Sequence, residues 1–400
     1  MLTELILRNF KSFREASLAL GPLTVISGVN ASGKSNLVDA LRFVHGLARG
    51  YTLPDAVGQV YGESGERVWS GIRGGLYHLI YKEDYTECAS MRIDARFAYV
   101  DAQSCQHSAN YGVSVLRRSS TDYSIGNQSI AMDGREPLLL STDDDPTLDP
   151  VFRHMGRMAL DSERDHDYEE PLIQAGSLLE SMRFLDFDPE ALKKPSFPGQ
   201  KVLGDKGENL SSVLYEIWQD DAAKKRFAHW LNELTPTDVS NLDFYKDPAG
   251  LVTLKIEEQA GRTIYPYSAS HGTLRFLALL AALLGPKPAR IHVLEEIENG
   301  IHPARLNLLI NLLESVTRQG QTQIIATTHS PLVLSLLSPD SLEHATVTYR
   351  LEGQPDTKAR RILDIPHARE LLKKQDLARL HASGWLEDAL ELSESEEIAV

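Results

Sequence analysis

Cysteine is almost absent from this sequence. Its 400 residues include only two, Cys88 and Cys105, and no CxxC spacing occurs. Two cysteines cannot form a disulfide framework, and without CxxC pairs the common zinc-binding patterns are excluded. The histidines show no metal-ligand spacing either. We therefore expect no zinc site and a reducing compartment, the cytoplasm.

Long apolar runs are also missing. The most apolar stretch, Phe276–Leu284, has nine residues, whereas a membrane-spanning helix needs about 18. The first ten residues, MLTELILRNF, include Glu4 and lack the basic-then-apolar order of an export signal. We expect neither a membrane partner nor export.

Positive charge is in deficit, with 41 Lys and Arg against 56 Asp and Glu and a net charge of −15. Such a surface as a whole repels phosphate backbones, so DNA binding would need a local basic patch or an assembled groove. The run Lys224-Lys225-Arg226, followed by Trp230, is such a patch, but a solvated helix face is the simpler interpretation. The apolar content, 42%, is that of an ordinary globular chain and excludes a mostly disordered protein.

The hydrophobic pattern predicts an α/β protein with a different middle. Residues 1–50 and 273–345 alternate apolar strands with amphipathic helices, which is typical of a parallel sheet. Residues 92–130 alternate as antiparallel strands, 209–234 have a helical pattern, and 141–170 are acidic and poor in apolar residues, as in a loop or insertion. We predict four segments: 1–90, 91–260, 261–345 and a tail, 346–400.

The strongest motif is the glycine-rich segment Gly28–Ser35. It reads GxxxxGKS and lies between an apolar strand and a helix, which is the context that a phosphate-binding loop requires. The glycines let successive backbone N–H groups face a phosphate, Lys34 adds a point charge, and Ser35 offers a Mg²⁺ ligand. The predicted nucleotide contacts are Gly28, Asn30, Ala31, Ser32, Gly33, Lys34, Ser35 and Asn36.

A second motif, Ile291–Glu296, delivers two carboxylates to the end of an apolar strand. Ligands of parallel α/β sheets bind at the carboxyl ends of strands. One carboxylate, Glu295, can hold Mg²⁺, while the next, Glu296, can polarise an attacking water. Together with the phosphate loop, the pair predicts nucleotide hydrolysis.

Two further segments admit two interpretations each. His329, just past the apolar strand 323–327, is either a capping or core histidine or a sensor of the γ-phosphate. Ser270, at the start of the helix expected over 273–284, is either an N-cap or, with Gly272, a phosphate contact offered to a nucleotide held by another subunit.

Five segments occur in an order that resembles the stand-alone ATPases with an ABC-type head, a group that includes RecF, the SMC proteins and the ATPase half of OLD-family proteins. They are ILRNFKSF, GVNASGKSN, SASHGTLRFLAL, LEEIENGIHP and TTHSP. The sequence is most similar to small AAA family ATPases without a coiled coil, often from bacterial mobile-element and antiphage loci. The resemblance implies a P-loop NTPase fold with a mixed sheet, an antiparallel lobe and a partly helical insertion. For the middle of the chain, about residues 90–260, the sequence suggests no family to us.

The resemblance also assigns roles to the motif residues. It makes Lys34 the Walker A lysine, and Ser35 and Glu295 the Mg²⁺ ligands, with Glu295 in place of the usual Walker B aspartate. Glu296 takes the place of the catalytic glutamate. His329 resembles the switch histidine, and Ser270 and Gly272 the signature residues that reach across a dimer. Glu298-Asn299-Gly300 would begin the interface loop, while Gln59 cannot be assigned as a lid glutamine.

The implied function is that of a Mg²⁺-dependent ATPase whose ATP-bound head-to-head dimer acts as a switch or motor on DNA or on a partner effector. Antiphage defence or DNA repair would be its setting. The alternative is a nucleotide-sensing scaffold with slow turnover that holds a separate nuclease or toxin. A transporter subunit is disfavoured because the LSGGQ wording is missing. The stretch after His329 is too short for the nuclease domain of OLD proteins, so we expect any nuclease on a separate chain.

Overall fold

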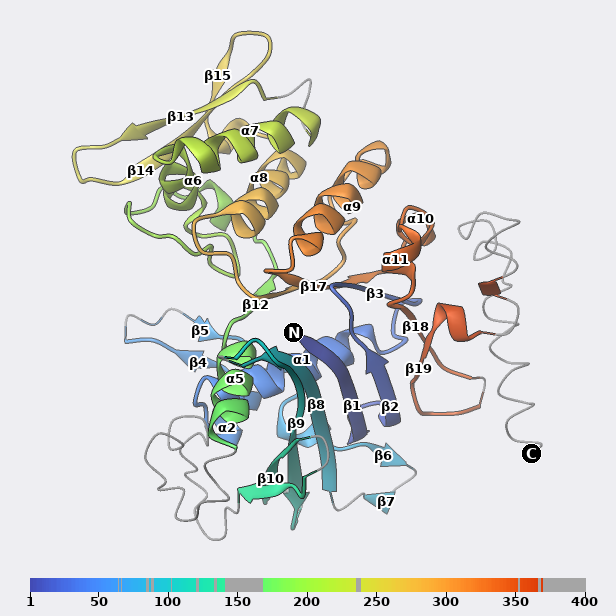
Figure 1. Ribbon diagram of the computed structural model, residues 1–400. Helices are drawn as coiled ribbons and strands as arrows, with labels where there is room; N and C mark the ends of the chain where they lie inside the picture. The colour runs from blue at the N-terminus through green and yellow to red at the C-terminus, as the bar shows by residue number, and fades with distance from the viewer. Residues whose placement is uncertain are drawn as a thin grey trace. The chain divides into compact units, whose positions relative to one another are not determined.

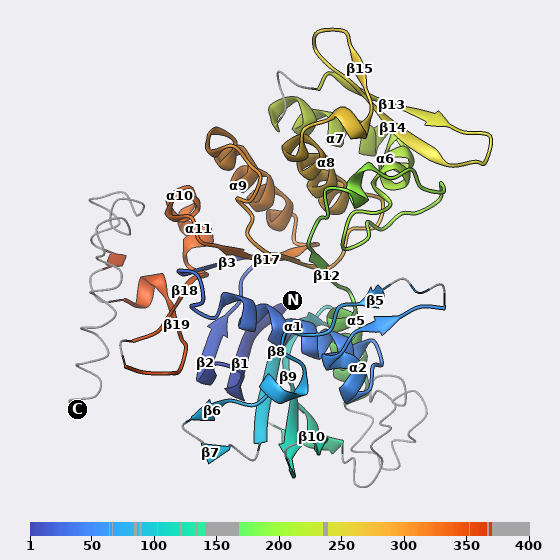
Figure 2. The same ribbon diagram turned by 180° about the vertical axis from the view of Figure 1, so that it is seen from behind.

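The computed structural model describes residues 1–63, 65, 67–83, 86–87, 90–101, 103–119, 122–132, 135–140, 168–234, 239–351, 353–365 and 368–369. The chain divides into two compact units (Figures 1 and 2). Unit 1 consists of Met1–Met182 with Pro339–Val400, and unit 2 consists of Arg183–Ser338. We describe each by itself.

The larger sheet of unit 1 is antiparallel, with the strand order β11-β10-β9-β8-β1-β2. Figures 1 and 2 show β10, β9, β8, β1 and β2 side by side. In β1 the side chains of Leu5 and Leu7, two positions apart, are both buried, as expected for a sheet with one face on a core. The strands are β1 (Leu2–Phe10), β2 (Phe13–Ala19), β8 (Ser90–Val100), β9 (Gln106–Arg117), β10 (Tyr123–Met132) and β11 (Leu138–Leu140).

A second group of strands in unit 1 carries the glycine-rich loop. β3 (Leu23–Ser27) is buried at every position and runs parallel to β18 (Ala345–Tyr349), which pairs antiparallel with β19 (Lys358–Arg361). α1 (Lys34–Ala48) follows the loop and packs against α5 (Glu169–Glu180), where the His45 ring nitrogen Nδ1 lies 2.7 Å from the Leu179 carbonyl oxygen. Parallel and antiparallel pairs together make the predicted mixed α/β architecture, which is confirmed.

Unit 1 also contains several short elements. They are α2 (Leu53–Val57), β4 (Val60–Tyr61), β5 (Arg67–Trp69), η1 (Leu76–His78), β6 (Lys82–Glu83), β7 (Thr86–Glu87), α11 (Pro339–Leu342) and η4 (Ile362–Asp364).

Unit 2 combines parallel strands with helices and a hairpin. β16 (Ile291–Leu294) pairs parallel with β17 (Gln323–Thr328), with β12 (Met182–Leu185) as the other neighbour of β16. The helices are η2 (Ala191–Lys193), α6 (Leu210–Trp218), α7 (Asp221–Leu234), η3 (Pro266–Ser268), α8 (His271–Leu284), α9 (Pro303–Arg318) and α10 (Pro331–Ser335). β13 (Asn241–Lys246), β14 (Val252–Glu257) and β15 (Thr263–Ile264) form a small antiparallel sheet.

The helix expected over 209–234 is two helices, because Asp220 ends the first and starts the second. Its carboxylate accepts hydrogen bonds from the backbone N–H groups of Ala222 and Ala223, and those bonds lower the pKa of the carboxyl group. An aspartate at this position favours a new N-terminus over a continuous helix.

The two units divide the chain differently from the four predicted segments. The antiparallel strands of 91–132 join β1 and β2 in unit 1, whereas the helical part after 183 belongs to unit 2. β18 crosses the predicted border at 345 because it pairs with β3, some 320 residues earlier. Most of the predicted acidic loop lies outside the described residues. Within the described part of the chain, no helix has the length and apolarity that crossing a membrane requires.

Candidate functional site

The glycine-rich loop between β3 and α1 has the curled backbone of a phosphate cradle. Gly28, Ala31 and Gly33 have φ angles of 155°, 64° and 101°. A Cβ atom on Gly33 would lie 2.5 Å from Cγ2 of Thr357, and one on Gly28 would lie 2.4 Å from the hydroxyl of Ser32. Glycine is therefore required at both ends of the loop, as the motif predicts. Left-handed residues at several positions of a short loop turn backbone N–H groups toward one point, which suits an anion.

Lys34 opens α1 and folds back over this loop. Its side chain is buried, and its ammonium group donates hydrogen bonds to the carbonyl oxygens of Gly28, at 2.6 Å, and Val29, at 2.9 Å. The first turn of α1 follows a glycine, which has no side chain to cap it. A cation, a helix N-terminus and a curled backbone thus meet in one place, so the residues present fit a bound phosphate.

Side chains distant in sequence hydrogen-bond to the loop and to the start of α1. The Ser32 hydroxyl lies 2.7 Å from that of Thr348 on β18. The Asn36 amide donates to Ser12 Oγ at 2.7 Å, and Thr357 Oγ1 donates to the same atom at 2.9 Å. Sequence reasoning missed Ser12, Thr348 and Thr357. Only Ser12 carried a signal, because it belongs to the ILRNFKSF segment.

An ion-pair cluster under α1 also escaped the sequence analysis. Asp39 is buried, and its carboxylate contacts Lys11 Nζ at 2.5 Å and Arg73 Nε at 3.3 Å. Burial lowers the pKa of Lys11, and the charge of Asp39 opposes that shift. Arg73 also donates to the carbonyl oxygen of Ser35 at 3.0 Å. The cluster therefore fixes the helix turn that carries Ser35, the predicted Mg²⁺ ligand.

In unit 2 the two predicted carboxylates stand on a tight turn after β16. Glu295 is half-buried, while Glu296 is exposed and has a φ of 50°, unusual for a residue other than glycine. The N–H of Glu296 donates to Thr327 Oγ1 at 3.0 Å. The N–H of Asn299 donates to the Glu296 carbonyl at 2.9 Å. Hydrogen bonds on both sides thus hold Glu296 in this conformation.

His329 is held by a carboxylate on the same turn. Its ring nitrogen Nδ1 lies 3.0 Å from Glu298 Oε1, and its backbone N–H donates to the same oxygen at 2.8 Å. The imidazole is 48% exposed, so it is oriented but accessible. An imidazole this exposed is not a core histidine, and its contact with a γ-phosphate stays a prediction. Sequence reasoning placed Glu298 in an interface loop and did not predict this contact.

Ser270 is the N-cap of α8, which starts at His271 rather than at the expected 273. Its hydroxyl accepts a hydrogen bond from the N–H of Thr273 at 3.0 Å. The capping interpretation is confirmed, and a contact with a second subunit stays a prediction. A Cβ atom on Gly272 would lie 2.9 Å from the carbonyl oxygen of Gly300, so the helix start packs directly on the turn after Glu296.

The donors available to a metal are hard oxygens: the Ser35 hydroxyl in unit 1 and the Glu295 carboxylate in unit 2. Within the described residues, no group of three or more His, Cys, Asp and Glu could hold a metal ion. Mg²⁺ commonly takes one or two protein oxygens and completes its shell with phosphate and water. Each of these two oxygens, taken within its own unit, is therefore of the kind that Mg²⁺ accepts when it is carried with a nucleotide.

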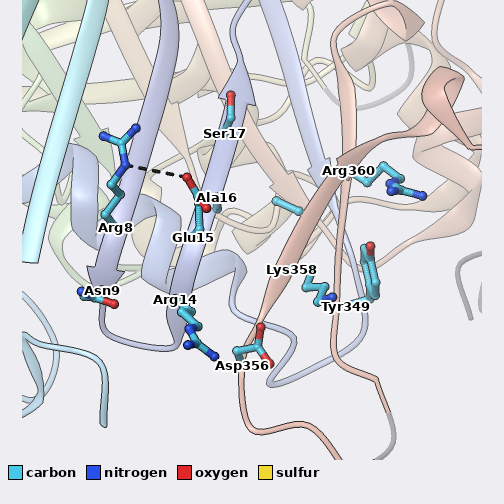
Figure 3. A pocket seen from close by; sticks show the side chains of 11 residues that line it. Arg8, Asn9, Arg14, Glu15, Ala16, Ser17, Tyr349, Asp356, Lys358 and Arg360 are labelled. Carbon is cyan, nitrogen blue, oxygen red and sulfur yellow. Dashed lines mark ion pairs between the residues drawn. The ribbon is translucent and has the colours of Figure 1, made fainter. Parts of the chain in front are cut away.

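Unit 1 also contains an open groove of about 680 Å³ between β2 and β19 (Figure 3). Four cations line it, but Arg8 already contacts Asp94 at 3.2 Å and Glu15 at 3.7 Å. The groove is a mixed-charge surface and not a strong cationic patch. Its lining comprises Arg8, Asn9, Arg14, Glu15, Ala16, Ser17, Tyr349, Asp356, Lys358, Ala359 and Arg360.

Two family models match this chain. Residues 1–107 match one described as "AAA ATPase domain", and residues 161–335 match one described as "AAA domain, putative AbiEii toxin, Type IV TA system". No curated protein matches the chain in sequence. The two models cover both predicted ends of the nucleotide-binding part. They also reach into the middle of the chain, at residues 90–107 and 161–260, for which the sequence had suggested no family.

Solved structures of SMC heads share the fold. A SmcHead bound to the C-winged helix domain of ScpA is 15% identical, with a TM-score of 0.55 over 90% of this chain and 96% of that one. A Smc head domain with an extended coiled coil, bound to the C-terminal domain of ScpA and derived from Pyrococcus furiosus, is 12% identical, with a TM-score of 0.54 over 93% and 98%. The two AAA models, which match opposite parts of the chain, and the fold shared with SMC heads together support an ABC-type-head AAA ATPase.

Proposed function

We propose that this protein hydrolyses ATP with Mg²⁺ and uses the ATP-bound state to form a head-to-head dimer. The observation that carries the proposal is the curled loop Gly28–Gly33 with the Lys34 ammonium folded over it at the start of α1. Phosphoryl transfer depends on positioning and on neutralising charge, and this arrangement supplies both. Bound Mg²⁺ would draw charge from the β- and γ-phosphate oxygens.

The chain's own residues then have separate tasks. Lys34 exchanges its carbonyl partners for phosphate oxygens, while Ser35 and Glu295 hold the metal. Glu296 accepts a proton from the attacking water, and its carboxylate is exposed on a turn that hydrogen bonds keep fixed. His329, oriented by Glu298, contacts the γ-phosphate.

The names of the matched proteins suggest what this chain acts on. The matched SMC heads are bound to domains of ScpA, which favours a partner protein for this chain as well. One matched family model is named for a toxin of a Type IV TA system, which favours a toxin or nuclease effector, and DNA is the other candidate target. Ser270 and Gly272 would face the nucleotide of the second subunit. Antiphage defence or DNA repair in the cytoplasm is the setting that we propose.

Replacing the lysine tests the proposal. Lys34→Ala removes the side-chain cation of the loop, so we expect turnover to fall about 1,000-fold, or about 4 kcal/mol in the barrier. Phosphate release and fluorescent-nucleotide binding, each with and without Mg²⁺, measure the loss. Lys255→Ala is the matched control, because Lys255 pairs with Asp243 on the hairpin of unit 2. Unchanged Mg²⁺-dependent turnover in Lys34→Ala rules the proposal out. Tight ATP binding without turnover in the wild type supports the slow-turnover scaffold instead.

A further inference from the structure

Arg275, in the second turn of α8, reaches the turn that carries Glu296. Its Nη2 atom donates to the carbonyl oxygen of Glu296 at 3.1 Å and lies 3.5 Å from that of Glu295. None of the sequence motifs gave this arginine a role. The contact joins the helix that Ser270 caps to the proposed catalytic glutamate of the same chain.

The conformation that Arg275 supports is a strained one. A φ of 50° costs a residue other than glycine roughly 1–2 kcal/mol. Such a residue keeps this conformation only where its surroundings fix it. The Glu296 carbonyl accepts from both Arg275 and the N–H of Asn299, and the Glu296 N–H donates to Thr327. Arg275 is the side chain that holds the carbonyl side of this peptide.

Burying the charged guanidinium of Arg275 beside this turn costs free energy, because the charge loses its contact with water. Burial lowers the pKa of Arg275, while the charges of Asp186, Glu298 and Glu296 raise it. Its Nε atom and the Oε2 atom of Glu298 are both buried without a hydrogen-bond partner among the residues described. A charge kept in such surroundings is typical of a group with a task beyond filling space.

The packing around Arg275 provides a mechanical link. The Arg275 stem comes within 3.9 Å of the position that a Cβ atom on Gly300 would occupy, and Gly272 packs against the Gly300 carbonyl. Displacement of the start of α8 would therefore move both the arginine and the turn.

We propose that Arg275 is a positioning residue that aims the Glu296 carboxylate and couples the start of α8 to hydrolysis in the same chain. The proposal rests on the proposed function for its effect on turnover. Whatever binds at Ser270 shifts the first turns of α8, and Arg275 passes that shift to the backbone of Glu296. A second subunit would then regulate the chemistry through this arginine.

Four variants and one control test the idea. Arg275→Ala should lower kcat about 10- to 100-fold and leave the KM for ATP within about twofold, because nucleotide contacts are unchanged. Arg275→Lys keeps one donor and should recover part of the loss. In Arg275→Ala/Glu296→Gln, kcat should equal that of Glu296→Gln alone, because two residues that act through one group are not additive. Arg262→Ala is the control, since Arg262 is 77% exposed and pairs with Glu258.

Hydrogen exchange separates this proposal from the proposed function. The amides of Ile297 and Asn299 should exchange about tenfold faster in Arg275→Ala than in the control, with β17 unchanged. Three results would each overturn the proposal. They are unchanged exchange at these amides, faster exchange together with a normal kcat, and a kcat of the double variant below that of Glu296→Gln alone. If the wild type hydrolyses no ATP, the proposed function fails. The exchange measurement alone then decides whether Arg275 holds the turn.

Discussion

The glycine-rich loop of unit 1 and the acidic turn of unit 2 both follow a buried strand, and both contain left-handed backbone. In the loop, two of the three left-handed residues are glycines, which adopt this conformation at little cost. In the turn, the residue is Glu296, whose carbonyl accepts hydrogen bonds from Arg275 and Asn299 and whose N–H donates one to Thr327. The loop offers backbone N–H groups, so glycine suffices there, whereas the turn must present a carboxylate. The strained φ of Glu296 is therefore kept because glycine could not supply that side chain.

Removing the Glu296 carboxylate from the acidic turn should have the largest effect, and that effect should be on kcat. Glu296→Gln keeps the shape but cannot accept a proton, so we expect kcat to fall about 1,000-fold while ATP binding survives. The dimer should then persist in Mg-ATP, which light scattering measures. Glu233→Gln, on the last turn of α7, is the control. No gain in dimer over the wild type would contradict the two-subunit mechanism.

Adding a methyl group to the loop should have the next largest effect. Gly33→Ala is strained at a φ of 101° and meets Thr357, so we expect a loss of about 2–3 kcal/mol in unfolding free energy and of nucleotide binding. Gly353→Ala shares a positive φ but has no atom within 4 Å of the added carbon. The difference between the two variants in denaturant unfolding isolates the contact with Thr357. Equal losses would mean that the close packing has no importance.

The start of α8 should show a smaller, selective effect. Ser270→Arg fills the surface predicted to meet a second subunit, so turnover should fall about tenfold with dimerisation. ATP affinity of the single chain should stay near that of the wild type. Ser270→Asp keeps an N-cap and controls for the lost capping hydrogen bond. Normal dimerisation and turnover in Ser270→Arg would leave Ser270 with its capping role alone.

The smallest expected effect is a change in unfolding free energy when glycine replaces Glu296 or, for comparison, its neighbour Glu295. Glu296→Gly removes the strain at φ 50°, so thermal unfolding should show a gain of about 0.5–1 kcal/mol together with loss of turnover. Glu295 has no positive φ, so Glu295→Gly should instead lose about 0.5–1 kcal/mol. A loss of stability in both would show that the turn is not strained.

The sequence predicted the local parts of the site because those parts depend on neighbouring residues. The loop between a buried strand and a helix follows from GxxxxGKS, and the Ser270 cap needs only Thr273, three residues on. The apolar run 291–294 predicts a buried strand, and the two glutamates that follow it are therefore expected at the end of that strand. Periodicity and capping are short-range effects, so one pass along the chain reveals them.

Tertiary structure alone decided which distant groups support these parts. Thr348 lies 316 residues from Ser32, and Glu298 lies 31 residues from His329. The pairing of β8 with β1 likewise joins distant residues, since Leu5 pairs with Ala95, and it determines which strands share a sheet. Hydrogen bonds and ion pairs of this kind depend on how elements pack, and no local pattern encodes their partners. The residues that hold the site in shape, Arg275 and Thr357 among them, therefore emerged only from the folded chain.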